Sequence, residues 1–219
     1  TNTLFCQIPL NLSEIRCMQG SWDKRYTEME GVYGRKPSPF WVQELQQCSG
    51  RAILLPCEGE GRNAVWAAQE GWNVDAFDSS EAGMATCKKW CEEAGVAHRV
   101  RTHTADALSF QGEPDGYDVV GLFYAHTPAS IRQQFHWRAA GWLKPGGTLI
   151  LEGFNPNQIG LSSGGPKDRD MLFSVEQLQD DFKDLKIEQL QTVQTHLDEG
   201  PFHQGKAEII RLIGRAING

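Results

Sequence analysis

The segment Ile53–Asn63, ILLPCEGEGRN, constrains the fold of this chain most strongly when it is read together with Asp78. A short apolar strand ends at Pro56 and leads into Gly-Glu-Gly, a helical pattern follows, and a second apolar run ends at Asp78. In parallel α/β sheets, a glycine turn lets the backbone approach a ligand, and a carboxylate after the next strand holds ribose hydroxyls. The pattern therefore predicts a site for a ligand that carries an adenosine or a ribose.

The composition is that of a globular protein, with 40% hydrophobic and 22% charged residues in 219. A net charge of −7 disfavours a nucleic-acid partner, and no apolar run approaches the ~18–20 residues of a membrane span. The start of the sequence lacks the pattern of a signal peptide. The six cysteines form no CxxC pair and no cysteine–histidine ligand spacing, and Cys87 and Cys91 suit core packing. We expect reduced thiols, no metal and a cytoplasmic location.

Apolar runs alternate with helical patterns between residues 51 and 153. The runs are mostly continuous, which suits a parallel sheet covered on both faces. Thr127 and Pro128 predict a helix start, with the threonine as cap and the proline at the first helical position. The predicted strands lie near 51–56, 72–77, 99–103, 117–123 and 147–153, and the predicted helices lie near 61–70, 80–94 and 128–141.

The pattern changes after residue 170. Ser174 and Gln177 form a capping-box pattern that opens a short helix. Residues 187–196 and 207–216 flank a turn-like DEGP and predict a hairpin of two longer strands. We expect a single α/β domain over residues 1–219, a Rossmann-like, doubly wound sheet of about seven strands. The sheet should be mostly parallel, with a C-terminal antiparallel hairpin.

This ordered set of motifs resembles the class I S-adenosylmethionine-dependent methyltransferases. The resemblance rests on ILLPCEGEGRN, on Asp78 and Asp106 after the second and third strands, on YDVVGLFYAH, on LKPGGTLILEGF and on the hairpin. Within that superfamily, GEGRNAVWAA looks most like the branch of tellurite-resistance and thiopurine methyltransferase-like proteins. The resemblance implies S-adenosylmethionine as the cofactor and a small molecule as the substrate.

The resemblance also implies the site residues. In that branch an N-terminal Trp-Asp-x-x-Tyr folds over the cofactor, so residues 1–48 are expected to form a helical cover and residues 51–219 the core. The implied cofactor-binding residues are Trp22, Tyr26, Glu58, Gly59, Gly61, Arg62, Asn63, Asp78, Ser79, Asp106 and Ala107.

The first-strand motif departs from the family pattern of acid-x-Gly-x-Gly-x-Gly. When the last two glycines are aligned on Gly59 and Gly61, Leu55 occupies the acid position and Cys57 the first glycine position. The methionine ammonium must then be held by a backbone carbonyl or by Glu58.

Several of these residues have a second interpretation. Glu58 and Glu60 could be solvated acids near a helix N-terminus, where the helix dipole favours them. Arg62 and Asn63 could position the cover or the cofactor carboxylate, or they could be a surface cation and a first-turn hydrogen bonder. Asp106 could contact the adenine amino group or cap the segment ALSF.

His126, after the fourth strand, is the candidate catalytic base, because its ordinary pKa lies near neutrality. The alternative is a partly buried histidine bonded to a backbone carbonyl, and Tyr124 is expected to be a pocket wall. The signature Asn/Asp-Pro-Pro-aromatic is absent here, which disfavours DNA bases and protein glutamine amides as substrates.

The polar loop 155–170 is long enough to be a lid, and its Lys167 and Arg169 could attract an anion, although Asp168 and Asp170 largely cancel their field. His196 and His203, beside the hairpin turn, are expected to be solvent-exposed rather than metal ligands.

The sequence therefore predicts a methyltransferase that acts on a small molecule, such as a thiol or a selenium or tellurium oxyanion, with oxygen and nitrogen nucleophiles left open. The alternative is an NAD-dependent oxidoreductase, because residues 59–64 also fit GxGxxA and Asp78 could serve its ribose. A non-catalytic adenosylmethionine binder is a third possibility. The oligomeric state stays open.

Overall fold

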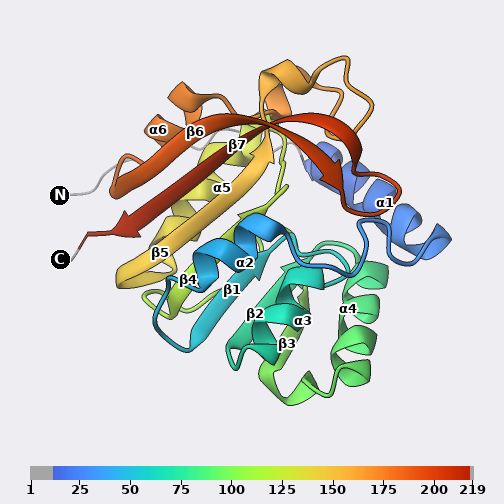
Figure 1. Cartoon of the computed structure of the whole chain (residues 1–219), viewed down its shortest axis with the longest axis vertical. Helices are drawn as coiled ribbons and strands as arrows, with labels where there is room; N and C mark the ends of the chain where they lie inside the picture. Colours follow the sequence, from blue (N-terminus) through green and yellow to red (C-terminus); the bar gives the residue numbers. More distant parts are fainter. Residues whose placement is uncertain (1–11, 218–219) are drawn as a thin grey trace.

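The computed structural model describes residues 12–217, which form one seven-stranded sheet with helices on both faces (Figure 1). The strands are β1 (Ala52–Pro56), β2 (Asn73–Asp78), β3 (Val100–Thr104), β4 (Tyr117–Phe123), β5 (Leu143–Phe154), β6 (Leu185–Asp198) and β7 (Gln204–Ala216). The α-helices are α1 (Leu12–Glu28), α2 (Pro39–Leu45), α3 (Arg62–Gln69), α4 (Glu81–Glu93), α5 (Ala129–Gly141) and α6 (Val175–Asp181). Three short 3₁₀ helices are η1 (Ala97–Arg99), η2 (Pro156–Gln158) and η3 (Arg169–Met171).

The strand order is β3-β2-β1-β4-β5-β7-β6. The first five strands pair in parallel, whereas β7 runs antiparallel to both β5 and β6. This confirms the predicted Rossmann-like sheet with its antiparallel C-terminal hairpin. The hairpin enters the sheet through its second strand, so β7 lies between β5 and β6, an order that the sequence pattern did not predict.

The two faces of the sheet carry separate cores, which explains the continuous apolar runs. Ile53 and Leu55 of β1 pack in the core that contains α2, α3 and α4, while Leu54 packs in the core that contains α5 and α6. Alternate residues of a strand point to opposite faces, so a strand covered on both sides must be apolar throughout. All three of these side chains are fully buried.

Two predicted helix starts have different outcomes. The capping box is confirmed, because the Ser174 hydroxyl accepts the Gln177 N–H and the Gln177 side chain accepts the Ser174 N–H. The start of α5 was predicted one residue early: Pro128 has an extended ψ of 144° and is the cap, and Ala129 is the first helical residue. Among the described residues, the buried Thr127 hydroxyl finds no hydrogen-bond partner, so it does not cap the helix.

Four cysteines are free thiols. Cys87 and Cys91 are buried on the inner face of α4, as predicted, and Cys48 and Cys57 are half-buried. Cys6 and the side chain of Cys17 lie outside what the structure describes.

Within residues 12–217, no helix is both long enough and apolar enough to cross a membrane. The longest, α1, has 17 residues and includes several charged ones.

Two glycines with similar positive φ angles allow the packing between the start of α3 and α4 to be tested. Gly61 has φ 89° and a Cβ added there would lie 2.3 Å from Cys87 Sγ, whereas Gly71 has φ 95° and open space around it. We expect Gly71→Ala to lower the free energy of unfolding by about 1–2 kcal/mol through left-handed strain alone. Gly61→Ala should cost about 1–3 kcal/mol more, because it also overpacks the core. Urea unfolding measures both, and equal losses would contradict the packing argument.

Candidate active site

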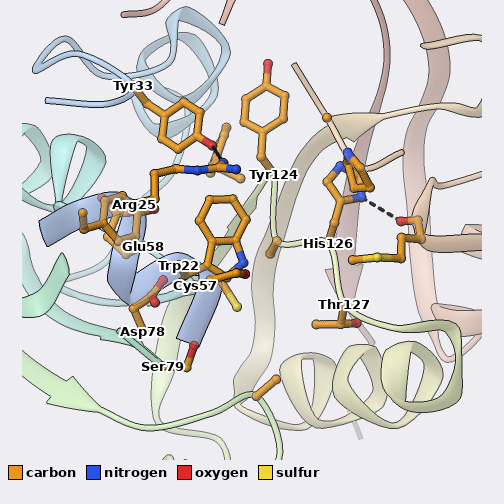
Figure 2. Close-up of a pocket in the computed structure, with 18 of the residues that line it drawn as sticks. Trp22, Arg25, Tyr33, Cys57, Glu58, Asp78, Ser79, Tyr124, His126 and Thr127 are labelled. Atoms are coloured by element: carbon orange, nitrogen blue, oxygen red, sulfur yellow. Dashed lines mark hydrogen bonds between the residues drawn. The ribbon is translucent and has the colours of Figure 1, made fainter. Parts of the chain in front are cut away.

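A pocket of about 550 Å³ lies where the carboxyl ends of β1, β2 and β4 meet α1 and the turn between β6 and β7. Figure 2 shows Trp22 and Arg25 of α1 on one side with Cys57 and Asp78, while His126 lies on the other. Every residue predicted for the site lines this pocket except Gly59. The volume lies in the range of small-molecule sites.

Asp78 is the last residue of β2, and its carboxylate is fixed by backbone donors. Oδ2 accepts the Gly59 N–H at 3.0 Å and Oδ1 accepts the Ser80 N–H at 2.8 Å. Burial raises the pKa of Asp78 to about 6. Each oxygen keeps accepting capacity beyond these bonds, so the carboxylate can receive hydroxyl donors from a ligand.

The departure from the family motif has a clear structural counterpart. Leu55, at the acid position, is fully buried in the core, so no charge enters the pocket there. Cys57, at the first glycine position, has φ 55°, a left-handed conformation that favours glycine. Glu58 supplies an acid instead: its Oε1 accepts the N–H groups of Asn63 and Ala64 at the start of α3. Burial raises the pKa of Glu58 to about 7.

The glycine turn holds the N-terminal segment as well as facing the pocket. Both oxygens of Glu60 accept backbone N–H groups, from Gly31 at 2.7 Å and from Val32 at 2.9 Å. Glu60 is 5% exposed, so its interpretation as a solvated acid is wrong. A Cβ on Gly59 would lie 2.4 Å from the Tyr26 hydroxyl. The absence of a side chain at Gly59 therefore lets Tyr26 of α1 pack closely against the turn.

Arg62 and Asn63 are buried at the start of α3 and bind other parts of the chain. Arg62 donates to the Tyr33 carbonyl at 3.3 Å and to the Glu199 carboxylate at 3.0 Å. Asn63 Oδ1 accepts the Ser38 N–H at 2.9 Å. Of the two interpretations for Arg62, the surface cation is wrong, and the contacts place both residues against the N-terminal segment.

The helix α1 brings an aromatic and cationic surface to the pocket. The Arg25 guanidinium lies 4.5 Å from the centroid of the Trp22 ring and donates to the Tyr33 hydroxyl at 2.8 Å (Figure 2). Asp23 connects this part of the helix to the start of α4, because its Oδ1 accepts a hydrogen bond from the Ser80 hydroxyl at 2.7 Å. Tyr26, next along the helix, is buried and stacks on Trp22 with centroids 5.9 Å apart.

Asp106 combines the two roles that the sequence left open. Its Oδ1 accepts the N–H groups of Leu108 and Ser109, as a cap does, and the half-buried side chain also lines the pocket. Ser79 and Ala107 line the pocket near it. A contact with adenine stays a prediction.

The environment of His126 favours the alternative to a catalytic base. Nδ1 bonds to the Met171 carbonyl at 2.8 Å, the contact dashed in Figure 2, and Nε2 accepts the Phe154 N–H at 3.0 Å. Both ring nitrogens are therefore engaged, and burial lowers the pKa of His126 to about 4. A base needs an accessible lone pair. This histidine instead links β5 to the loop before α6.

The pocket also contains residues that the sequence analysis did not assign to the site: Arg25, Tyr33, Phe154 and His203. His203 was expected to be exposed, but it is 4% exposed and contacts Glu199, whereas His196 is exposed as expected. No spacing signal identifies His203, because only the folding of the β6–β7 turn over the pocket buries it.

The long loop after β5 reaches the pocket with residues 165–168, which include Lys167. A lid function for this loop stays a prediction. Among the side chains that the structure describes, those of residues 19–217, no group of three or more histidine, cysteine or acidic residues could hold a metal ion.

The residues present fit S-adenosylmethionine. The Asp78 carboxylate suits ribose hydroxyls, and Ser79, Asp106 and Ala107, which line the same pocket, suit an adenine. The half-buried carboxylate of Glu58, which lines the pocket, suits the methionine ammonium. These donor and acceptor types match the nucleoside and amino-acid ends of such a molecule.

Comparison with known proteins finds methyltransferases. The family described as "Methyltransferase domain" matches residues 53–147. The ubiquinone biosynthesis O-methyltransferase of Pseudomonas fluorescens (strain SBW25) is 28% identical over 152 residues. The match covers 67% of this chain but only 63% of that relative's length.

Solved structures share the fold at low identity. A structure from work on the conversion of a disulfide bond into a thioacetal group in echinomycin biosynthesis has a TM-score of 0.71 at 17% identity, covering 91% of this chain and 92% of that one. TehB from Haemophilus influenzae has a TM-score of 0.68 at 14% identity, covering 89% and 67%. The Burkholderia thailandensis 1,6-didemethyltoxoflavin-N1-methyltransferase, solved with S-adenosylhomocysteine, has a TM-score of 0.70 at 14% identity, covering 98% and 94%.

The raised pKa of Asp78 predicts how cofactor binding depends on pH. If the ionised carboxylate accepts ribose hydroxyls, S-adenosylhomocysteine should bind at least tenfold more weakly at pH 5 than at pH 7, since the pKa is about 6. Glu58, whose pKa is about 7, should add to the loss. Asp78→Asn should bind more weakly at pH 7 and lose the Asp78 part of this dependence. Calorimetry from pH 5 to 8 measures it, and identical pH profiles for the two proteins would exclude Asp78 as a ligand.

Proposed function

We propose that this chain, which belongs to the class I S-adenosylmethionine-dependent methyltransferases, transfers a methyl group from that cofactor to a sulfur or oxygen atom of a small molecule. The observation that carries the proposal is a pocket with two chemically different ends. One end holds the acids Glu58, Asp78 and Asp106, and the other is walled by aromatic side chains.

The acidic end would hold the cofactor, with Asp78 at the ribose, Glu58 at the ammonium, and Ser79, Asp106 and Ala107 around the adenine. S-adenosylmethionine, when bound, supplies an electrophilic methyl group. The protein's own contribution is then to align an acceptor with that methyl group and to exclude water. The stacked rings of Trp22 and Tyr26 would cover this end.

The aromatic end would hold the acceptor. Four rings surround it, those of Tyr33, Tyr124, Phe154 and His203. The centroids of the first three lie 4.4–5.3 Å from the centroid of the His203 ring. The β6–β7 turn and the N-terminal segment lie over it, which favours a small acceptor over a macromolecule. Neither nucleic acid nor a membrane is proposed as a partner, since the net charge is −7.

The acceptor atom is proposed from chemistry and from the relatives together. Ubiquinone biosynthesis O-methyltransferase is named for an oxygen acceptor, and the echinomycin structure concerns sulfur chemistry. A second candidate is a selenium or tellurium oxyanion. It is favoured by Arg25, which has no carboxylate partner among the described residues, and by Lys167 in the loop. A non-catalytic binder would not need the aromatic end.

The NAD-dependent alternative is disfavoured by the sheet. A dinucleotide-binding fold places six parallel strands in the order 3-2-1-4-5-6. Here the antiparallel β7 lies between β5 and β6, and its turn contributes to the pocket.

Calorimetry of the full chain separates the two functions. S-adenosylmethionine and S-adenosylhomocysteine should bind with micromolar dissociation constants, about −8 kcal/mol, and NAD should give no heat. A methyl-transfer screen over aromatic thiols, phenols and selenite should then give turnover on one class. Binding of NAD without either sulfur ligand would overturn the proposal.

A further inference from the structure

We propose that His203, oriented by Glu199, is the catalytic base that removes the proton from the methyl acceptor. The inference rests on the proposed function, because it needs an acceptor in the aromatic end of the pocket. It assigns the base to a residue in the β6–β7 turn, 77 positions after the histidine that the sequence pattern favoured.

The first observation is the orientation of the ring. His203 Nδ1 lies 3.3 Å from Glu199 Oε2, and the same carboxylate oxygen accepts a hydrogen bond from Arg62 Nη2 at 3.0 Å. Because a carboxylate only accepts, the neutral histidine donates Nδ1–H to Glu199 and keeps its lone pair on Nε2. A histidine that a carboxylate orients in this way is arranged to take a proton from a substrate.

The second observation is the position of the ring. It lies between Tyr33 and Tyr124, with centroids at 4.4 and 4.5 Å, and its edge faces Phe154 at 5.3 Å. The side chain lines the pocket, and Nε2 has no hydrogen-bond partner among the side chains that the structure describes, residues 19–217. The edge of the ring that carries Nε2 lies near Gly164, where only a glycine leaves room beside it. The ring is therefore fixed by packing, and no described group of the chain bonds to its second nitrogen.

The charges around His203 keep it neutral at rest. Burial lowers the pKa of His203, Arg62 on α3 and Arg25 on α1 lower it further, and Glu199 raises it. Tyr33 and Tyr124 also face the ring, and burial raises the pKa of each, so both are neutral. His203 thus has a free lone pair at neutral pH, and Glu199 is placed to stabilise the imidazolium that forms when the ring takes a proton.

The proposed step balances without a further reactant. The acceptor, a thiol or a phenol, loses its proton to His203 Nε2 while its sulfur or oxygen bonds to the methyl carbon. The bond from that carbon to the cofactor sulfur breaks, and its electron pair stays on that sulfur, which becomes a neutral thioether. The imidazolium then releases its proton to solvent as the products leave.

The proposal narrows the acceptor to a protic nucleophile. A base accelerates transfer only when the acceptor still carries a proton at the working pH. A selenium or tellurium oxyanion is already ionised at neutral pH and would gain nothing from His203. The dyad therefore favours thiols and phenols over the second candidate above.

The test compares two histidines of the same hairpin in the full chain. His203→Ala and Glu199→Gln are measured with His196→Ala as the matched control, since His196 is exposed and away from the pocket. The probes are benzyl mercaptan and selenite, with kcat and KM measured from pH 6 to 10. Calorimetry with S-adenosylhomocysteine and a thermal melt show that each variant is folded and binds the cofactor product.

We expect His203→Ala to lower kcat on benzyl mercaptan by ~10²–10⁴ at pH 7, with a smaller loss above the pKa of the thiol. Glu199→Gln should give a smaller loss with the same pH trend, and His196→Ala should stay within about twofold of the wild type. Equal kcat for wild type and His203→Ala at every pH would overturn the inference alone. A wild type that does not bind S-adenosylhomocysteine would overturn the proposed function and the inference with it.

A second measurement does not depend on turnover. Nitrogen NMR of the histidine rings, assigned by comparison with His203→Ala, should show His203 as the Nδ1–H tautomer with a pKa below the ordinary ~6.5. In Glu199→Gln that pKa should fall further, because the carboxylate that stabilises the cation is gone. An Nε2–H tautomer in the wild type would overturn the proposal.

Discussion

The buried ion pair between Arg62 and Glu199 connects the parts of the chain on which the pocket depends. Its two side chains are 9% and 10% exposed, and Arg62 also donates to the Tyr33 carbonyl. The pair thereby joins α3, the β6–β7 turn and the N-terminal segment above the carboxyl ends of the parallel strands. Removing one partner of a buried pair leaves an unpaired charge, at a typical cost of about 3–5 kcal/mol. The ion pair thus connects the β6–β7 turn and the N-terminal segment to the glycine turn that precedes α3.

The acids of the glycine turn and of the end of β2 show how the site combines structure and binding. Glu58, Glu60 and Asp78 each accept backbone N–H groups, so their positions are fixed before any ligand arrives. Burial raises the pKa of all three, since charge is less well solvated there. Both oxygens of Glu60 accept N–H groups of the N-terminal segment, whereas the carboxylates of Glu58 and Asp78 lie at the acidic end of the pocket. The glycine turn and the end of β2 thus position the N-terminal segment and provide a surface for binding.

The sequence predicted what local patterns determine. The strands, the capping box at Ser174 and the acid at the end of β2 follow from apolar runs and short-range spacing. The roles of Glu60, Arg62 and His203 could not be predicted in this way, because their partners lie far along the chain: 137 positions separate Arg62 from Glu199. The same reason applies to His126, whose bonds to Met171 and Phe154 arise only when β5 and the following loop fold beside it.

The central claim is that the N-terminal segment and the β6–β7 turn close over one pocket shared by cofactor and acceptor. Hydrogen exchange of the backbone amides, measured with and without S-adenosylhomocysteine, tests it directly, because local opening governs exchange. The account predicts slower exchange in three places at once: residues 19–34, residues 57–64 and residues 199–205. Slowing confined to residues 57–64, with the other two segments unchanged, would contradict the claim.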